Sequence, residues 1–127
     1  IYNEALELST EDAKAFDKVI ESYSVAKNTD AEKAARKAAI IETTLGAAEI
    51  PARVADLGLT VLNTAKSLDG KTNPNAASDL KVAALLANAG IRGAIANIRI
   101  NATGLDDPRA KDYLIRADHV EQAVAVS

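Results

Sequence analysis

Apolar side chains recur every three or four residues along nearly the whole chain. This spacing predicts five helices, over residues 1–26, 29–50, 51–68, 77–102 and 107–124. Thr29 and Glu32 form a capping box at the start of the second helix, and Asp107 with Pro108 begins the last. Pro51 lacks a backbone donor and predicts a kink or an interruption. We therefore predict an all-α fold, an antiparallel bundle of about five long helices with one kinked or interrupted at Pro51.

Four polar residues fall on apolar faces of these helices. At about 100° per residue, Asp12 lies within the apolar stripe of the first helix. Asp79, Asn97 and Asn101 lie at the centre of the apolar face over residues 77–102, where alanine and glycine leave room for a second helix or a flat ligand. A buried, unpaired carboxylate is costly, so we expect these side chains to be buried and paired, protonated or part of a site.

Each of the four residues also has a structural alternative. Asp79 lies in the first turn of its helix, where a carboxylate favours the helix dipole. Asn97 and Asn101 are suited to hydrogen-bonding neighbouring backbone across a tight helix crossing. Asp12 is suited to pairing with a buried lysine or arginine. The helical pattern alone leaves these alternatives open.

Composition excludes several classes of function. Hydrophobic residues make up 48% of the chain but aromatic residues only 3%, which predicts an aliphatic core with the few Tyr and Phe residues within it. The absence of cysteine excludes thiolate chemistry, and a lone histidine, His119, excludes a multi-histidine metal site. Gly90 and Gly93 lie inside a helix, which argues against a phosphate loop and favours close packing.

Charge and hydropathy bear on partners and location. The net charge is −3 and no basic block exceeds two residues, which argues against nucleic acid as a partner. No apolar run approaches the roughly 20 residues of a membrane span, so we expect no membrane partner. No signal peptide is visible, and a cytoplasmic location is expected.

Four short segments follow one another in order between about Leu8 and Tyr113. They are Asp12–Asp17 (DAKAFD), Glu32–Arg36 (EKAAR) with Ala48–Pro51 (AEIP), Asn73–Leu80 (NPNAASDL), and Gly93–Asn101 (GAIANIRIN) followed by Asp106. In order and spacing they resemble the formiminotetrahydrofolate cyclodeaminase and methenyltetrahydrofolate cyclohydrolase family. The resemblance covers most of the chain and depends on all four segments together.

The resemblance implies an all-helical homodimer that binds a reduced folate in a cleft, with no metal and no cofactor beyond tetrahydrofolate as substrate. It implies one domain over residues 1–127, without the upstream helices and glycine-rich loop of family members. We expect a cyclodeaminase, which closes formiminotetrahydrofolate to methenyltetrahydrofolate and releases ammonia. The alternatives are a cyclohydrolase, which opens methenyltetrahydrofolate to formyltetrahydrofolate, and a non-catalytic helical folate-binding or interaction protein.

Either reaction needs a proton shuttle and hydrogen bonds that orient the pterin. Buried carboxylates suit the shuttle because burial raises their pKa toward neutrality. We therefore predict that Asp12 or Asp79 moves the proton, while Asn97 and Asn101 orient the substrate or backbone. The remaining candidates for binding the substrate are Asn75, Ser78 and Arg36, with Arg99, on the polar face, as a further candidate for the folate carboxylates.

Overall fold

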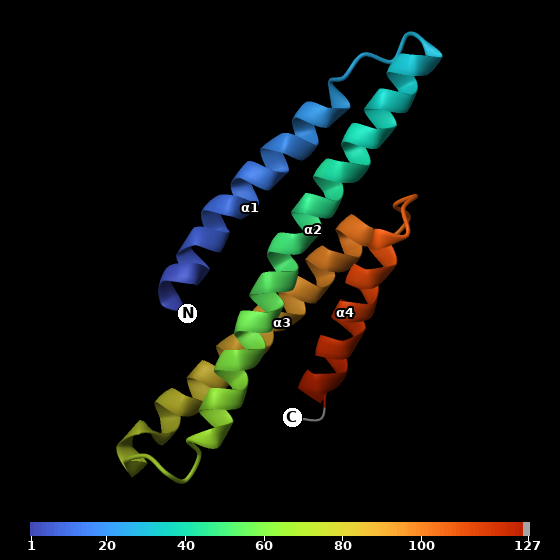
Figure 1. Ribbon diagram of the computed structural model, residues 1–127. Helices are drawn as coiled ribbons and strands as arrows, with labels where there is room; N and C mark the ends of the chain where they lie inside the picture. The colour runs from blue at the N-terminus through green and yellow to red at the C-terminus, as the bar shows by residue number, and fades with distance from the viewer. Residues whose placement is uncertain (126–127) are drawn as a thin grey trace.

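The computed structural model describes residues 1–125, which form an all-helical protein (Figure 1). In this range the helices are α1 (Tyr2–Tyr23), α2 (Asp30–Ser67), α3 (Ala77–Ala102) and α4 (Arg109–Ala125), with a 3-10 turn, η1 (Pro74–Ala76), before α3. Successive helices run antiparallel, and the described range contains no strand, so the all-α prediction is confirmed. None of these helices is long and apolar enough to cross a membrane. Residues 126 and 127, included in the single-domain prediction, lie outside the described residues.

The prediction of about five helices is wrong at Pro51. Helix α2 continues through this residue for 38 residues, which leaves four long helices in the described part of the chain. A proline inside a helix removes one backbone hydrogen bond and crowds the preceding turn, at a cost of about 3 kcal/mol. Pro51 and its neighbours Ile50 and Ala52 are all buried, however. Their packing keeps this segment helical.

Local signals in the sequence set the helix ends. Glu32 donates its backbone N–H to Thr29 Oγ1 at 3.1 Å, and its carboxylate accepts the backbone N–H of Thr29 at 3.3 Å, which confirms the capping box. Before α4, the Asp107 carboxylate accepts the backbone N–H of Arg109 at 2.8 Å. Gly104, after α3, has a φ of +80°, a conformation that glycine adopts without strain.

The main core lies between α2, α3 and α4 and is aliphatic, as predicted. It is formed by Ala52, Ala55, Leu62, Ile91, Ala94, Ile95, Ile98, Ala117, Val120 and Val124. A Cβ at Gly58 would lie 2.6 Å from Ile91 Cγ1, so glycine is needed for the close approach of α2 and α3. Small residues therefore bring these helices together.

Helix α1 packs against α2 alone. Leu8 and Ser22 are its buried residues, and Arg53 of α2 forms an ion pair with Glu11 at 2.8 Å. Its aromatic side chains contradict the prediction of a core role: Phe16 is 62% exposed, and Tyr2 and Tyr23 are also exposed. Helices α1 and α3 flank α2 without contacting each other, so no element of the described chain covers this side of α1.

Candidate functional site

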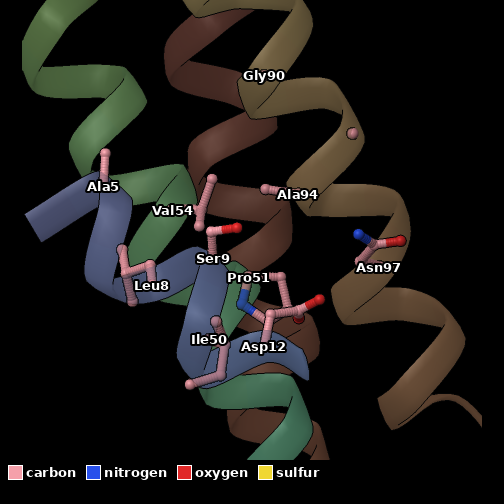
Figure 2. A pocket seen from close by; sticks show the side chains of 11 residues that line it. Ala5, Leu8, Ser9, Asp12, Ile50, Pro51, Val54, Gly90, Ala94 and Asn97 are labelled. Carbon is pink, nitrogen blue, oxygen red and sulfur yellow. The ribbon is translucent and has the colours of Figure 1, made fainter. Parts of the chain in front are cut away.

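A cleft of about 370 Å³ lies between α1 and α3, with α2 as its floor (Figure 2). The residues that line it come from all three helices: Ala5, Leu8, Ser9 and Asp12 from α1; Ile50, Pro51 and Val54 from α2; and Gly90, Gly93, Ala94 and Asn97 from α3. The floor is apolar, and most of the polar groups stand on the flanking helices. The cleft therefore exists because α1 and α3 sit on either side of α2 at a distance from each other.

Asp12 and Asn97, two of the predicted site residues, both line this cleft. Figure 2 shows the Asp12 carboxylate reaching from α1 toward the side of the cleft where Asn97 lies. Within residues 1–125, neither side chain forms a hydrogen bond or an ion pair. Arg53 pairs with Glu4 and Glu11 instead, so the alternative of a structural ion pair for Asp12 is not observed. The carboxylate and the amide are thus available to a ligand.

Ser9 also lines the cleft, one helical turn before Asp12, although sequence reasoning did not single it out. Ser9 precedes Asp12 by three residues, which places the two side chains on one face of α1. This spacing is the feature of the sequence from which Ser9 could have been predicted. The hydroxyl adds a further donor and acceptor beside the carboxylate. The polar part of the cleft thus comprises Ser9, Asp12 and Asn97.

Gly90 and Gly93 form part of the α3 wall of the cleft. The prediction that they permit close packing is not met within the described single chain, because a Cβ at either position would meet no atom within 4 Å. Instead, the two glycines leave this part of the α3 wall without side chains, opposite the apolar floor formed by α2. An apolar cleft with a few polar groups at its sides is typical of a small-molecule site.

The predicted burial of the four polar residues is wrong for the single chain. Asp12, Asp79 and Asn97 are exposed, and Asn101 is half-buried. The helical wheel identified the apolar faces, but part of each face is left uncovered by the rest of the described chain. Asp79 lies in the first turn of α3, as its structural alternative predicted.

Asp79, Ser78 and Asn75 lie at the opposite end of α3 from the cleft. Asn75 belongs to η1, where its backbone N–H donates to Asn73 Oδ1 at 3.0 Å. Asp79 precedes Asn97 by 18 residues, which corresponds to about 27 Å along the helix. Within one chain, these residues therefore cannot contact the same substrate carbon as Asp12.

The remaining site candidates also lie outside this cleft. Asn101, one turn beyond Asn97, does not line it. The Arg36 guanidinium lies 5.3 Å from the centroid of the Tyr23 ring and donates to the Tyr23 carbonyl at 3.3 Å. Arg36 lines a second hollow, near the start of α2.

Arg99 is engaged with α4. It pairs with Asp118 at 2.8 Å and Glu121 at 2.6 Å. Hydrogen bonds to Glu121 and Asp118 hold the pKa of the Arg99 guanidinium above its ordinary value. Arg99 also does not line the cleft, so the structure does not bring it together with Asp12 and Asn97. Among residues 1–125, no group of three or more His, Asp or Glu side chains is placed to hold a metal ion.

Comparisons with known proteins bear on the family of this chain. Residues 1–118 match the model of a family described as formiminotransferase-cyclodeaminase. The chain is also similar to a methenyltetrahydrofolate cyclohydrolase of Methylorubrum extorquens AM1, with 43% identity over 97 residues, which cover 76% of this chain and 47% of that protein. The chain thus spans about half the length of this curated relative. The family match covers most of the chain, including the residues of the cleft, and it establishes that the chain belongs to the formiminotransferase-cyclodeaminase family of folate one-carbon enzymes.

Proposed function

We propose that this protein is a methenyltetrahydrofolate cyclohydrolase, with Asp12 and Asn97 in its active site. The observation that carries the proposal is the pair of unpartnered polar side chains that face an apolar slot from α1 and α3. The slot suits the flat pterin, and the carboxylate suits a reaction that moves protons. The relative from M. extorquens favours the hydrolytic reaction over the cyclodeaminase reaction expected first from the sequence.

The reaction assigns a distinct task to each side chain. Water adds to the methenyl carbon, which is bonded to two folate nitrogens, and Asp12 accepts the proton that this water loses. The bond from the carbon to one nitrogen then breaks, and the hydroxyl proton passes to the departing nitrogen, leaving a formyl group on the other. One water is consumed and one proton is released. The Asn97 amide offers one donor and one acceptor group to the edge of the pterin.

Cyclodeaminase activity is the second candidate. The family description includes it, and the same tetrahedral carbon forms when the formimino group closes onto the second folate nitrogen and ammonia leaves. In that reaction Asp12 would protonate the departing amine instead of deprotonating water. The two reactions differ in the group that enters or leaves the carbon, while the demands on the slot are the same.

The proposal also includes a homodimer formed through the face that borders the cleft. Exposed residues on α1 and α3 follow steps of three and four and form two stripes, Tyr2, Leu6, Ser9, Ala13, Phe16 and Ile20 on α1, and Val82, Leu86, Ala89, Gly93, Ala96 and Ile100 on α3. Such spacing is typical of helices that pack against partner helices. Ser9 and Gly93 belong to the stripes and also line the cleft. A second copy on this face would cover the cleft and desolvate Asp12.

The test of activity is optical. The protein is mixed with methenyltetrahydrofolate, and the loss of its near-ultraviolet absorbance is compared with the uncatalysed rate. Acceleration supports the cyclohydrolase. If absorbance instead rises from formiminotetrahydrofolate and methenyltetrahydrofolate is stable, the protein is a cyclodeaminase. No acceleration in either assay would support the non-catalytic folate-binding alternative and overturn the proposed function.

The homodimer is tested by sedimentation of the protein and of Phe16→Glu. The substitution places a charge in the middle of the α1 stripe without touching the core, because Phe16 is exposed in the single chain. We expect the protein to sediment as a dimer and the variant as a folded monomer with much reduced turnover. Equal sedimentation of the two proteins would place the dimer interface elsewhere or exclude it.

A further inference from the structure

Helix α1 rests on α2 along a single row of side chains. The residues of α1 that are not exposed follow one another at steps of three and four, and they are Glu4, Leu8, Glu11, Ala15, Val19 and Ser22. Among the helices of the described chain, α1 contacts α2 alone. Contacts along this row therefore decide how α1 is turned about its axis, and with it the direction in which Asp12 points.

The part of this row near the cleft differs from the rest, because two of its three residues are acidic. Leu8, which is 1% exposed, lies between Glu4 and Glu11. Arg53 of α2 pairs with both acids: its Nη1 lies 2.8 Å from Glu11 Oε2, and its Nη2 lies 3.9 Å from Glu4 Oε1. The two acids are seven residues apart, about two helical turns. One guanidinium thus links two turns of α1 to α2 across a buried leucine.

Besides Leu8, the residues of α1 that line the cleft form a second row. They are Ala5, Ser9 and Asp12 (Figure 2), and each directly follows a member of the row that faces α2. Successive residues of a helix differ in direction by about 100°. When the first row faces α2, the second therefore faces the cleft between α1 and α3. Neither Arg53 nor its two acidic partners line the cleft.

Other contacts hold α1 on α2 independently of Arg53. Leu8 is buried near the cleft, and towards the end of α1 the Thr43 hydroxyl lies 3.2 Å from Ser22 Oγ. Removal of the Arg53 ion pairs should therefore leave α1 on α2 and the chain folded. Apolar contact such as that of Leu8 is non-directional, whereas hydrogen-bonded ion pairs of arginine have a defined geometry. Near the cleft, Arg53 supplies the contacts of the second kind.

We propose that Arg53 is a positioning residue, which fixes the rotation of α1 through Glu4 and Glu11 and so directs the Asp12 carboxylate into the cleft. This inference rests on the proposed function, in which Asp12 accepts a proton from water. Without Arg53, Glu4 and Glu11 are left unpaired beside α2, where carboxylates are poorly solvated. The helix then turns to expose them to water, and the turn carries Asp12 away from the substrate carbon.

The kinetic test is Arg53→Met, which keeps the aliphatic stem of the side chain and removes both ion pairs. A displacement of about 1 Å between reacting groups lowers a rate by about a hundredfold, so kcat should fall by about that factor. KM should change little, because the floor of the cleft and Asn97 are untouched. Circular dichroism checks that the variant is folded.

The matched control is Arg116→Met. Arg116 of α4 also pairs with two acids of α2, Glu49 and Asp56, both at 3.1 Å, and it is 39% exposed against 37% for Arg53. Arg116 does not line the cleft and does not contact α1, so this variant should keep the kcat of the unmodified protein. An equal fall in kcat in both variants would overturn the inference, because the effect would then be a general loss of stability.

A double-mutant cycle tests whether Arg53 acts through α1. Glu11→Gln should also lower kcat, and Glu11→Gln/Arg53→Met should have a kcat no lower than that of Arg53→Met, because the same interaction has already been lost. If Arg53 instead bound the substrate, Arg53→Met would raise KM, and Glu11→Gln would change neither constant. That outcome would overturn the positioning role.

A structural measurement tests the same inference without turnover. The chain has no cysteine, so nitroxide labels can be attached at Thr10→Cys on α1 and Thr60→Cys on α2, both exposed positions outside the cleft. Dilution with unlabelled protein restricts the electron-spin distance to one chain. We expect the distance distribution to broaden or shift in Arg53→Met and to stay unchanged in Arg116→Met.

The two measurements separate failure of the inference from failure of the proposed function. An unchanged distance distribution in Arg53→Met would overturn the inference, even in an active enzyme. A changed distribution, together with no turnover in the unmodified protein, would overturn the proposed activity and support the control of α1 by Arg53.

Discussion

Helix α2 is packed very differently on its two sides. On the side that faces α3 and α4, here called the packed side, alanine and glycine bring the helices together around Ile91, which is completely buried. On the side that forms the floor between α1 and α3, the open side, the flanking helices do not touch, and Asp12 and Asn97 face a cleft. The packed side holds the core of the chain, and the open side holds the cleft proposed as the active site.

Apolar periodicity along a helix has two different causes in this molecule. On the packed side, apolar periodicity identifies residues that other parts of this chain bury. On the open side, the same periodicity continues through Phe16 and Leu86, which are 62% and 68% exposed. Exposed apolar side chains that recur along one helix face are the feature behind the proposed dimer interface. Substitutions on the two sides should therefore affect different properties of the protein.

The largest effect expected is the loss of turnover in Asp12→Asn. The substitution keeps the shape of the side chain but removes its ability to accept a proton, so kcat should fall by about a thousandfold. Folding should be unchanged, because Asp12 has no partner among the described residues. The measurement is the rate of loss of methenyltetrahydrofolate absorbance, with circular dichroism as the check on folding.

Asp79→Asn is the matched control on the same assay. Asp79 lies about 27 Å from Asn97 along α3, so its substitution should leave turnover within about twofold. If Asp79→Asn is the inactive variant and Asp12→Asn retains activity, proton transfer does not take place in the cleft between α1 and α3 of one chain.

The next effect concerns stability and distinguishes the packed side from the open side. Ile91→Ala removes a fully buried side chain and should lower the free energy of unfolding by about 2–5 kcal/mol at any protein concentration. Phe16→Ala should change the free energy of unfolding of the monomer by less than about 0.5 kcal/mol. It should lower stability further only at protein concentrations where the proposed dimer forms. Urea unfolding at two protein concentrations checks both values. A large, concentration-independent loss in Phe16→Ala would mean that α1 is buried within the single chain.

The sequence predicted those parts of the fold that have local causes. The bounds of α3, residues 77–102, match the prediction because turn signals stand at both ends, in Asn73–Pro74 and Thr103–Gly104. The capping box of Thr29 is likewise a local feature. The effect of Pro51 is not predictable from its local sequence, because burial of Pro51 among its neighbours overrides helix propensity.

The site was only partly predictable. A helical wheel selects Asp12 and Asn97, and the structure places both in one cleft. The wheel selects Asp79 equally well, because it records direction around an axis and ignores distance along it. Which residues line the same cleft depends on how α1 and α3 flank α2. Such arrangements are tertiary and have no local signature.

Asn97→Ala should have a smaller effect on catalysis than Asp12→Asn. Loss of one or two hydrogen bonds to the pterin should lower kcat/KM by about tenfold, while stability is preserved because Asn97 is exposed and unpartnered. Steady-state kinetics with methenyltetrahydrofolate provide the measurement. Gly46→Ala on α2, where a Cβ meets no atom within 4 Å, is the control for a small change at a residue that does not line the cleft. An unchanged kcat/KM in Asn97→Ala would remove the amide from substrate binding.

The smallest expected effect is a weaker dependence of stability on pH in Tyr113→Phe, a variant on the packed side. The Tyr113 hydroxyl donates to Glu49 Oε2 at 2.8 Å and ties α4 to α2. Burial, together with the hydrogen bond to Glu49 and its negative charge, raises the pKa of Tyr113 to about 12. Because the unfolded phenol titrates near pH 10, the stabilisation is complete below about pH 10 and is lost as pH rises through 12. Tyr113→Phe should lower the free energy of unfolding by about 1 kcal/mol at neutral pH. Between about pH 10 and 12, the free energy of unfolding should decline less steeply in this variant than in the unmodified protein, as measured by urea titration. An identical decline in both proteins would mean that the hydroxyl of Tyr113 does not stabilise the contact between α4 and α2.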